Sequence, residues 1–159
     1  MPSPRPHKIL MVCMGNICRS PLAECVFRHK AGVRGVADRF EVDSAGTGGW
    51  HAGEPPDARV RRVAASNGVE LSGVARQVSA ADFCNFDHII CMDDDNREHL
   101  LRMGAPPSKV RLLLDVLPQS SVREVPDPYY GGLEGFQEVF RLVDQACDAL
   151  LDELTAVRQ

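Results

Sequence analysis

The sequence from Lys8 to Pro21, KILMVCMGNICRSP, is an apolar run that leads through a short loop into the start of a helix. Residues 8–13 are almost wholly apolar, which is typical of a strand buried on both faces. Ser20 followed by Pro21 is typical of the first turn of a helix. The glycine and the asparagine between them tolerate unusual backbone angles. The stretch therefore predicts a strand, a tight loop and a helix in immediate succession.

The same alternation of strand and helix continues along the chain. Alternation of apolar and polar residues before a glycine-rich turn predicts a strand over residues 40–44, and further apolar runs predict strands over residues 88–92 and 110–114. Helices are expected after residue 20, over residues 57–68 and 93–103, and along the apolar stripe from Phe136 to Leu154. Strands that alternate with helices predict an α/β fold with a four-stranded parallel sheet covered by helices on both faces. We expect a flexible tail over residues 1–7 and one three-layer domain over residues 8–157.

Length and composition agree with one globular domain. The 159 residues carry 18 basic and 22 acidic side chains, a net charge of −4, and 44% of them are hydrophobic. The acidic balance argues against a nucleic-acid or anionic-membrane partner. No apolar run could span a bilayer and no signal-peptide pattern is present, so we expect a cytoplasmic protein, with export by a signal-independent route left open. Only three of the 18 basic residues are lysine, which favours a GC-rich bacterial genome.

The loop after the first strand has the composition of an anion site. Backbone N–H groups at a helix N-terminus attract anions, and Arg19 can present two donors to a tetrahedral oxyanion. Among such dipoles, Cys13 should be held as a reactive thiolate near neutral pH. The Gly-Lys-Ser/Thr sequence of nucleotide-binding loops is absent. We also expect no metal site and no cofactor, because the Cys and His spacings of metal sites are missing.

Several motifs together resemble one known family. These are Cys-x5-Arg-Ser at residues 13–20, Asp-Ser-Ala-Gly-Thr at 43–47, Ala-Arg-Gln at 75–77, Cys-Met-Asp at 91–93 and Asp-Pro-Tyr-Tyr at 127–130. The combination is similar to the low-molecular-weight protein tyrosine phosphatases, from about residue 9 to residue 151. The resemblance implies hydrolysis of phosphotyrosine and aryl phosphates, with phosphotyrosine proteins as partners.

The resemblance also implies roles for individual residues. Cys13 would attack phosphorus and form a phosphocysteine, while Asp127 would protonate the leaving group and later activate water. Arg19 would bind the phosphate together with the loop residues Met14, Gly15, Asn16, Ile17, Cys18 and Ser20. Ser20 would also donate a hydrogen bond to the thiolate, a role compatible with capping the helix.

Further residues are implied to support this site. Asn16 and Ser44 would brace the loop, with Asn16 in a left-handed conformation. The aromatic residues Trp50, Tyr129 and Tyr130 would line a cleft deep enough for a phenyl phosphate. A reversible Cys13–Cys18 disulfide could protect the nucleophile, although Cys18 fits equally well as a buried thiol.

Two further positions show how far the resemblance reaches. Asp93 follows the third strand near the expected site, and its pattern favours a helix N-cap over a catalytic role. Many members of the family carry a histidine before Ala75 that helps to brace the loop. This chain has Ser72, Gly73 and Val74 there, so the rigidity of its loop should differ.

Two other functions remain open from the sequence. An arsenate reductase shares the fold and the Cys-x5-Arg-Ser loop, and its relay of two further thiols could use Cys84 and Cys91. A phosphotyrosine-binding module without catalysis is the second alternative, although the nucleophile, the arginine and the acid are all present. The physiological substrate, the oligomeric state and any phosphorylation of the two tyrosines are not readable from the sequence.

Overall fold

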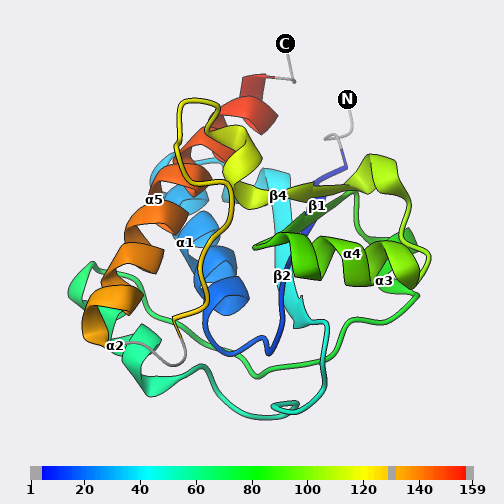
Figure 1. Ribbon diagram of the computed structural model, residues 1–159. Coiled ribbons are helices and arrows are strands. Elements are labelled where there is room, and N and C mark those ends of the chain that lie inside the picture. The colour runs from blue at the N-terminus through cyan, green and yellow to red at the C-terminus, as the bar shows by residue number, and fades with distance from the viewer. Residues whose placement is uncertain (1–4, 129–131, 157–159) are drawn as a thin grey trace.

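The computed structural model describes residues 5–128 and 132–156 and has a central sheet between two layers of helices (Figure 1). The strands are β1 (His7–Cys13), β2 (Phe40–Gly46), β3 (His88–Cys91) and β4 (Val110–Leu112). They form one parallel sheet in the order β2-β1-β3-β4. This arrangement confirms the predicted three-layer α/β fold.

Helices cover both faces of the sheet. The five α-helices are α1 (Arg19–Val33), α2 (Ala58–Ser66), α3 (Asp82–Asn85), α4 (Asp94–Arg102) and α5 (Leu133–Ala156). Short 3-10 turns occupy Ala37–Arg39, Pro107–Lys109 and Leu113–Val116. In Figure 1, α1, α2 and α5 lie on one side of the sheet, and α3 and α4 lie on the other. None of the helices in the described part of the chain is long and apolar enough to cross a membrane.

The central strand β1 supplies side chains to both cores. Ile9 and Met11 pack in the larger cluster with α1, α2 and α5, whereas Leu10 and Val12 pack in the smaller cluster toward α4. All four side chains are fully buried, and burial of each contributes about 1.5–3 kcal/mol to folding. The continuous apolar run at residues 9–12 therefore serves two layers at once.

The ends of the elements differ slightly from the prediction. β1 begins at His7, one residue inside the predicted tail. β2 continues to Gly46, because the Gly46 N–H donates to the Arg76 carbonyl and Gly46 pairs with Gln77 in a short parallel bridge. The fourth strand ends at Leu112, and the next residues turn into a 3-10 helix. The four-residue helix α3 has too few positions to show a period in the sequence.

The strand order determines where a site can form. The chain passes from β1 to β2 on one side and then to β3 on the other side of β1. In parallel sheets, such a reversal opens a crevice at the carboxyl ends of the strands. Here that crevice lies at Cys13, the last residue of β1. Cys13 pairs in register with Gly46 of β2, and the preceding residue, Val12, pairs with Cys91 of β3.

Candidate active site

The loop between β1 and α1 closes around the sulfur of Cys13. The Asn16 backbone N–H donates to Cys13 Sγ at 3.2 Å, and Ser20 Oγ lies 3.0 Å from the same sulfur. Ser20 Oγ accepts a hydrogen bond from Asn16 Nδ2 at 2.7 Å, and its own hydrogen can be donated to the sulfur, which lies nearer than the Ala45 carbonyl oxygen at 3.5 Å. Hydrogen bonds from two donors stabilise a negative charge on sulfur.

Asn16 has the predicted left-handed backbone, with φ of 59°. Its carboxamide fixes this conformation through two contacts, because Nδ2 donates to Ser20 and Oδ1 accepts from the Arg76 backbone N–H at 3.0 Å. A left-handed residue other than glycine is strained, and such strain persists only where surrounding contacts hold it. The Arg76 backbone is thus the partner that ties the loop to the rest of the fold.

The structure gives Asn16 and Ser44, the two residues expected to brace the loop, separate hydrogen-bond partners. Ser44 Oγ donates instead to Glu24 Oε1 at 2.7 Å, while the Asn16 carboxamide has the partners just described. A carboxylate is a stronger hydrogen-bond acceptor than an amide oxygen, so the Ser44 hydroxyl donates to Glu24 rather than to the Asn16 carboxamide. Ser44 therefore links β2 to α1 behind the loop.

Residues 72–74, where many family members have the bracing histidine, lie near the contact between Ser44 and Glu24. Gly73 has φ of 89°, a conformation that favours glycine. A small cavity of about 150 Å³ separates residues 72–74 from Asn16, Glu24 and Ser44. In this chain, the brace therefore comes from backbone and carboxylate groups.

Arg19 is the first residue of α1 and its side chain is only 3% exposed. One terminal nitrogen lies 2.6 Å from Asp93 Oδ2 and donates to the Val125 carbonyl at 3.1 Å. Burial lowers the pKa of Arg19, but attraction by Cys13 and the hydrogen bond to Asp93 outweigh it and raise the pKa above its usual value. The guanidinium is therefore a fixed and permanent positive charge beside the sulfur.

Asp93 combines two roles, of which the sequence indicated only one. As predicted, it is the N-cap of α4, where Oδ1 accepts from the Asn96 N–H at 2.8 Å. Its other oxygen binds Arg19, a contact that spans 74 positions in the chain. The signal that could have revealed this role is an acidic residue directly after β3, since β3 adjoins β1 and their carboxyl ends meet at one edge.

Asp127 faces Arg19 from a different segment. Its Oδ2 lies 3.7 Å from Arg19, and its side chain is 35% exposed. The flanking residues Pro126 and Pro128 limit the freedom of the backbone there. The predicted site residues Tyr129 and Tyr130 lie outside the described residues.

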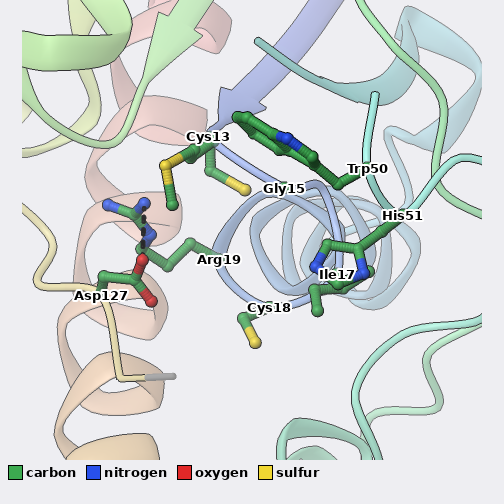
Figure 2. Close-up of a pocket in the computed structure, with 9 residues that line it drawn as sticks. Cys13, Gly15, Ile17, Cys18, Arg19, Trp50, His51 and Asp127 are labelled. Atoms are coloured by element: carbon green, nitrogen blue, oxygen red, sulfur yellow. Dashed lines mark ion pairs between the residues drawn. The ribbon is translucent and has the colours of Figure 1, made fainter. Parts of the chain in front are cut away.

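A cavity of about 320 Å³ opens between these groups (Figure 2), which is within the range of small-molecule sites. In Figure 2, Arg19 and Asp127 lie on one side and Trp50 and His51 on the other. Nine residues line the cavity: Cys13, Met14, Gly15, Ile17, Cys18, Arg19, Trp50, His51 and Asp127. Asn16 and Ser20 are buried behind this surface rather than in it.

The wall formed by Trp50 and His51 depends on a glycine. Trp50 is 72% exposed, and its ring lies so close to Gly48 that a Cβ there would overlap it, at 1.8 Å. His51 contacts Glu54 through Nδ1 at 3.1 Å, and its ring approaches Gly15. The sequence analysis missed His51, because nothing in its local pattern distinguishes it from an exposed loop residue.

Three further thiols could take part in redox chemistry with Cys13, and they differ in burial and in the face of the sheet on which they lie. Cys18 lines the cavity, yet burial, followed by the nearby Asp57, Cys13 and Asp127, raises its pKa to about 12 and keeps it protonated. Cys91 is buried in the smaller core cluster, where burial raises its pKa, and Cys84 is exposed on α3. Since Cys13 belongs to the larger cluster on the other face, these positions do not favour the thiol relay of an arsenate reductase.

Comparisons with known proteins agree with this site. Residues 8–159 match the model of the family described as low molecular weight phosphotyrosine protein phosphatase. The low molecular weight protein-tyrosine-phosphatase YfkJ of Bacillus subtilis is 42% identical over 95% of this chain and 97% of its own length. The human low molecular weight phosphotyrosine protein phosphatase is 39% identical over 91% of this chain and 94% of its own length.

Solved structures give the same result. The crystal structure of YfkJ superposes with a TM-score of 0.94 at 39% identity and covers 99% of this chain and 100% of that one. A Drosophila protein described as an arginine phosphatase also superposes, with a TM-score of 0.87 at 33% identity, over 92% of this chain and 97% of its own. Similar chains thus include enzymes with different phosphorylated substrates.

Proposed function

The chain belongs to the low molecular weight phosphotyrosine protein phosphatase family, and from this premise we propose that it hydrolyses phosphotyrosine in proteins through a phosphocysteine intermediate. The observation that carries the proposal is the meeting of Cys13, Arg19 and Asp127 around one cavity. It supplies a nucleophile, a fixed cation and a carboxyl group at a single crevice, which is what phosphoryl transfer requires.

In the first step, the Cys13 thiolate attacks phosphorus and forms the S–P bond. The bond from phosphorus to the phenolic oxygen breaks, and the protonated Asp127 gives its proton to that oxygen. Arg19, held by Asp93 and Val125, binds the phosphoryl oxygens without having to reorganise. Ser20 stabilises the sulfur as a thiolate, which also makes it a better leaving group later.

In the second step, water hydrolyses the phosphocysteine. Asp127, now a carboxylate, removes a proton from the water as its oxygen attacks phosphorus, and the S–P bond breaks. Inorganic phosphate leaves and Cys13 returns to the thiolate. The atoms balance without a metal, a reductant or a cofactor.

The cavity wall supports an aryl substrate. Ile17 and Trp50 provide apolar surface between the entrance and Cys13, suited to the faces of a phenyl ring. A phosphoserine side chain is shorter and would leave this surface uncovered. All six cysteines are free thiols, which supports a reducing compartment, and we propose that the enzyme acts in the cytoplasm. The small number of lysines supports a bacterial source. We also propose that residues 8–157 form one domain.

The test compares phosphate release from three peptides that differ only in carrying phosphotyrosine, phosphoserine or phosphoarginine. We expect turnover of the phosphotyrosine peptide without added reductant, no turnover by Cys13→Ser, and full turnover by the control Cys84→Ser, whose thiol is exposed outside the cavity. Acid quenching during turnover should trap one phosphoryl group on Cys13. Preference for phosphoarginine, or activity that survives in Cys13→Ser, would contradict the proposal.

A further inference from the structure

The segment that carries Asp127 has buried residues on both sides of the carboxyl group, Val125 before it and Pro128 after it. Val125 is fully buried, and its N–H donates to the Met92 carbonyl at 2.8 Å. The Val125 carbonyl accepts from Arg19 at 3.1 Å. Two residues later, Asp127 lies exposed at the cavity. On the N-terminal side, its position therefore depends on how the backbone is held at Val125 and just before it.

Two charged residues directly before Val125 provide that hold. A carboxylate oxygen of Glu124 accepts the Asp94 backbone N–H at 2.8 Å, at the first residue of α4. Arg123 forms an ion pair with the Asp94 side chain. The positive end of a helix attracts a carboxylate, so the Glu124 contact has charge as well as geometry in its favour.

The surface that receives them is itself rigid. Asn96 is 2% exposed, and its side-chain oxygen accepts the backbone N–H groups of Met92 and Asp93. Asp93 returns a contact to the Asn96 N–H, which completes a capping box. The start of α4 is thus locked before any contact with the other segment is made.

Three successive residues at this turn hold different parts of the site. Met92 fixes Val125, Asp93 fixes Arg19, and Asp94 receives both Arg123 and Glu124. The same turn therefore sets the position of Arg19 and of the segment that carries the acid.

We propose that Arg123 and Glu124 are positioning residues that hold Asp127 at the correct distance from Arg19 for proton transfer to the leaving group. The inference rests on the proposed function, because it assigns these two residues to the acid of that reaction. Neither residue lines the cavity, so they act only through Asp127. Phosphate binding and the nucleophile should be independent of them, since residues 13–20 form that part of the site.

The experiment measures kcat/KM for a series of aryl phosphates whose leaving phenols range from strongly to weakly acidic. For Glu124→Ala and Arg123→Ala, we expect a loss of roughly 3- to 10-fold with the least acidic phenols and almost none with the most acidic, which need little protonation. Glu124→Gln keeps an oxygen for the Asp94 N–H and should recover most of the loss. The control Glu153→Ala removes another exposed glutamate, an ion-pair partner of Arg111, and should leave the series unchanged.

Two further measurements separate positioning from general damage. Inhibition by inorganic phosphate should be unchanged in Glu124→Ala, whereas a disturbed fold would weaken it. In an Asp127→Ala background, Glu124→Ala should cause no additional loss. An equal loss across the whole series, or no loss at all, would overturn the inference. If Asp127→Ala itself leaves the dependence on the phenol unchanged, the assignment of the acid in the proposed function fails instead.

Discussion

The loop over residues 13–20 and the segment over residues 118–128 face each other across the cavity, and they are built in opposite ways. In the loop, Cys13, Asn16, Arg19 and Ser20 are all at most 3% exposed. Cys13, Asn16 and Ser20 hold one another, and Arg19 is held by Asp93 and Val125. In the segment, Asp127 is 35% exposed and the backbone forms no helix or strand. Charge recognition is thus preorganised, whereas the proton donor depends on a few contacts. Substitutions in the loop should therefore weaken phosphate binding as well as kcat/KM, whereas substitutions in the segment should affect mainly the protonation of the leaving group.

The largest effect is expected from Arg19→Lys, which tests the rigid side. Lysine cannot present the two-pronged donor of arginine, and Asp93 and Val125 would lose their fixed partner. We expect kcat/KM for an aryl phosphate to fall about 10³-fold, by analogy with the loss of fixed transition-state donors. Inhibition by inorganic phosphate should weaken as well. The control Arg141→Lys, at an exposed ion pair of α5, should be neutral, and a loss below about 10-fold for Arg19→Lys would contradict the comparison.

The next effect is expected from Asp127→Ala, which tests the exposed side. We expect kcat/KM to fall about 10²-fold with a weakly acidic phenol and much less with p-nitrophenyl phosphate, the usual scale of general acid catalysis. Inhibition by inorganic phosphate should change little, because the loop remains intact. Equal losses with both substrates would show that the two sides are not functionally distinct.

Asn16→Ala should produce a smaller effect that combines stability with rate. Alanine in the left-handed region costs about 1–2 kcal/mol, and about 1 kcal/mol more is lost with each of the two carboxamide hydrogen bonds, so the free energy of unfolding should fall by roughly 3–4 kcal/mol. Asn16→Gly removes the same hydrogen bonds without the backbone strain, and it should be the more stable of the two. Denaturant unfolding and kcat/KM, with an expected loss of about 10-fold, measure both effects. Equal stability of the two variants would mean that the strain at φ of 59° does not exceed the roughly 0.5–1 kcal/mol that the greater freedom of glycine in the unfolded chain costs.

The smallest effect concerns the brace behind the loop. Arg76 places its backbone N–H on Asn16, and its side chain pairs with Asp82, whose side chain is 7% exposed. Burial raises the pKa of Asp82, but the hydrogen bonds from Arg76 and Ser79 outweigh it and lower the pKa below its usual value. A lowered pKa in the folded state contributes stability above the unfolded pKa of about 3.9, and this stability is lost as the pH falls further.

Asp82→Asn should therefore reduce the free energy of unfolding by about 1 kcal/mol at pH 7 and make its decline below about pH 4 shallower. Unfolding curves at a series of pH values measure both. An identical pH dependence in the variant would show that this ion pair does not support the loop. The exposed residue Glu138 offers a control, since Glu138→Gln changes a pair on the far surface of α5.

The two regions also differ in how well the sequence predicted them. The loop was predictable because Cys13 and Arg19 are six residues apart and their chemistry is local, and φ at Asn16 was confirmed. The partners of Arg19 were harder, since Asp93 and Val125 lie 74 and 106 positions away. Only the strand order β2-β1-β3-β4 brings them together.

Partner choice was the other limit of prediction. Ser44 was expected to brace the loop together with Asn16, and only the three-dimensional arrangement shows that the partner of its hydroxyl is Glu24. Asp93 fitted its local pattern so well as an N-cap that its place directly after the third strand was not interpreted as a contact with Arg19. The resemblance placed Trp50 at the cleft, where the structure has it, whereas His51 meets the cavity through the path of a loop, which spacing and periodicity do not encode.

The end of β2 sets a limit for anyone who wishes to redesign this enzyme. A Cβ on Gly46 would lie 2.8 Å from the Met14 carbonyl oxygen, so at this point main chain is stacked directly on main chain. Repacking of neighbouring side chains gives no relief from such a collision. Mutant libraries aimed at a new substrate should therefore keep Gly46 and vary Trp50 and His51, whose side chains line the cavity.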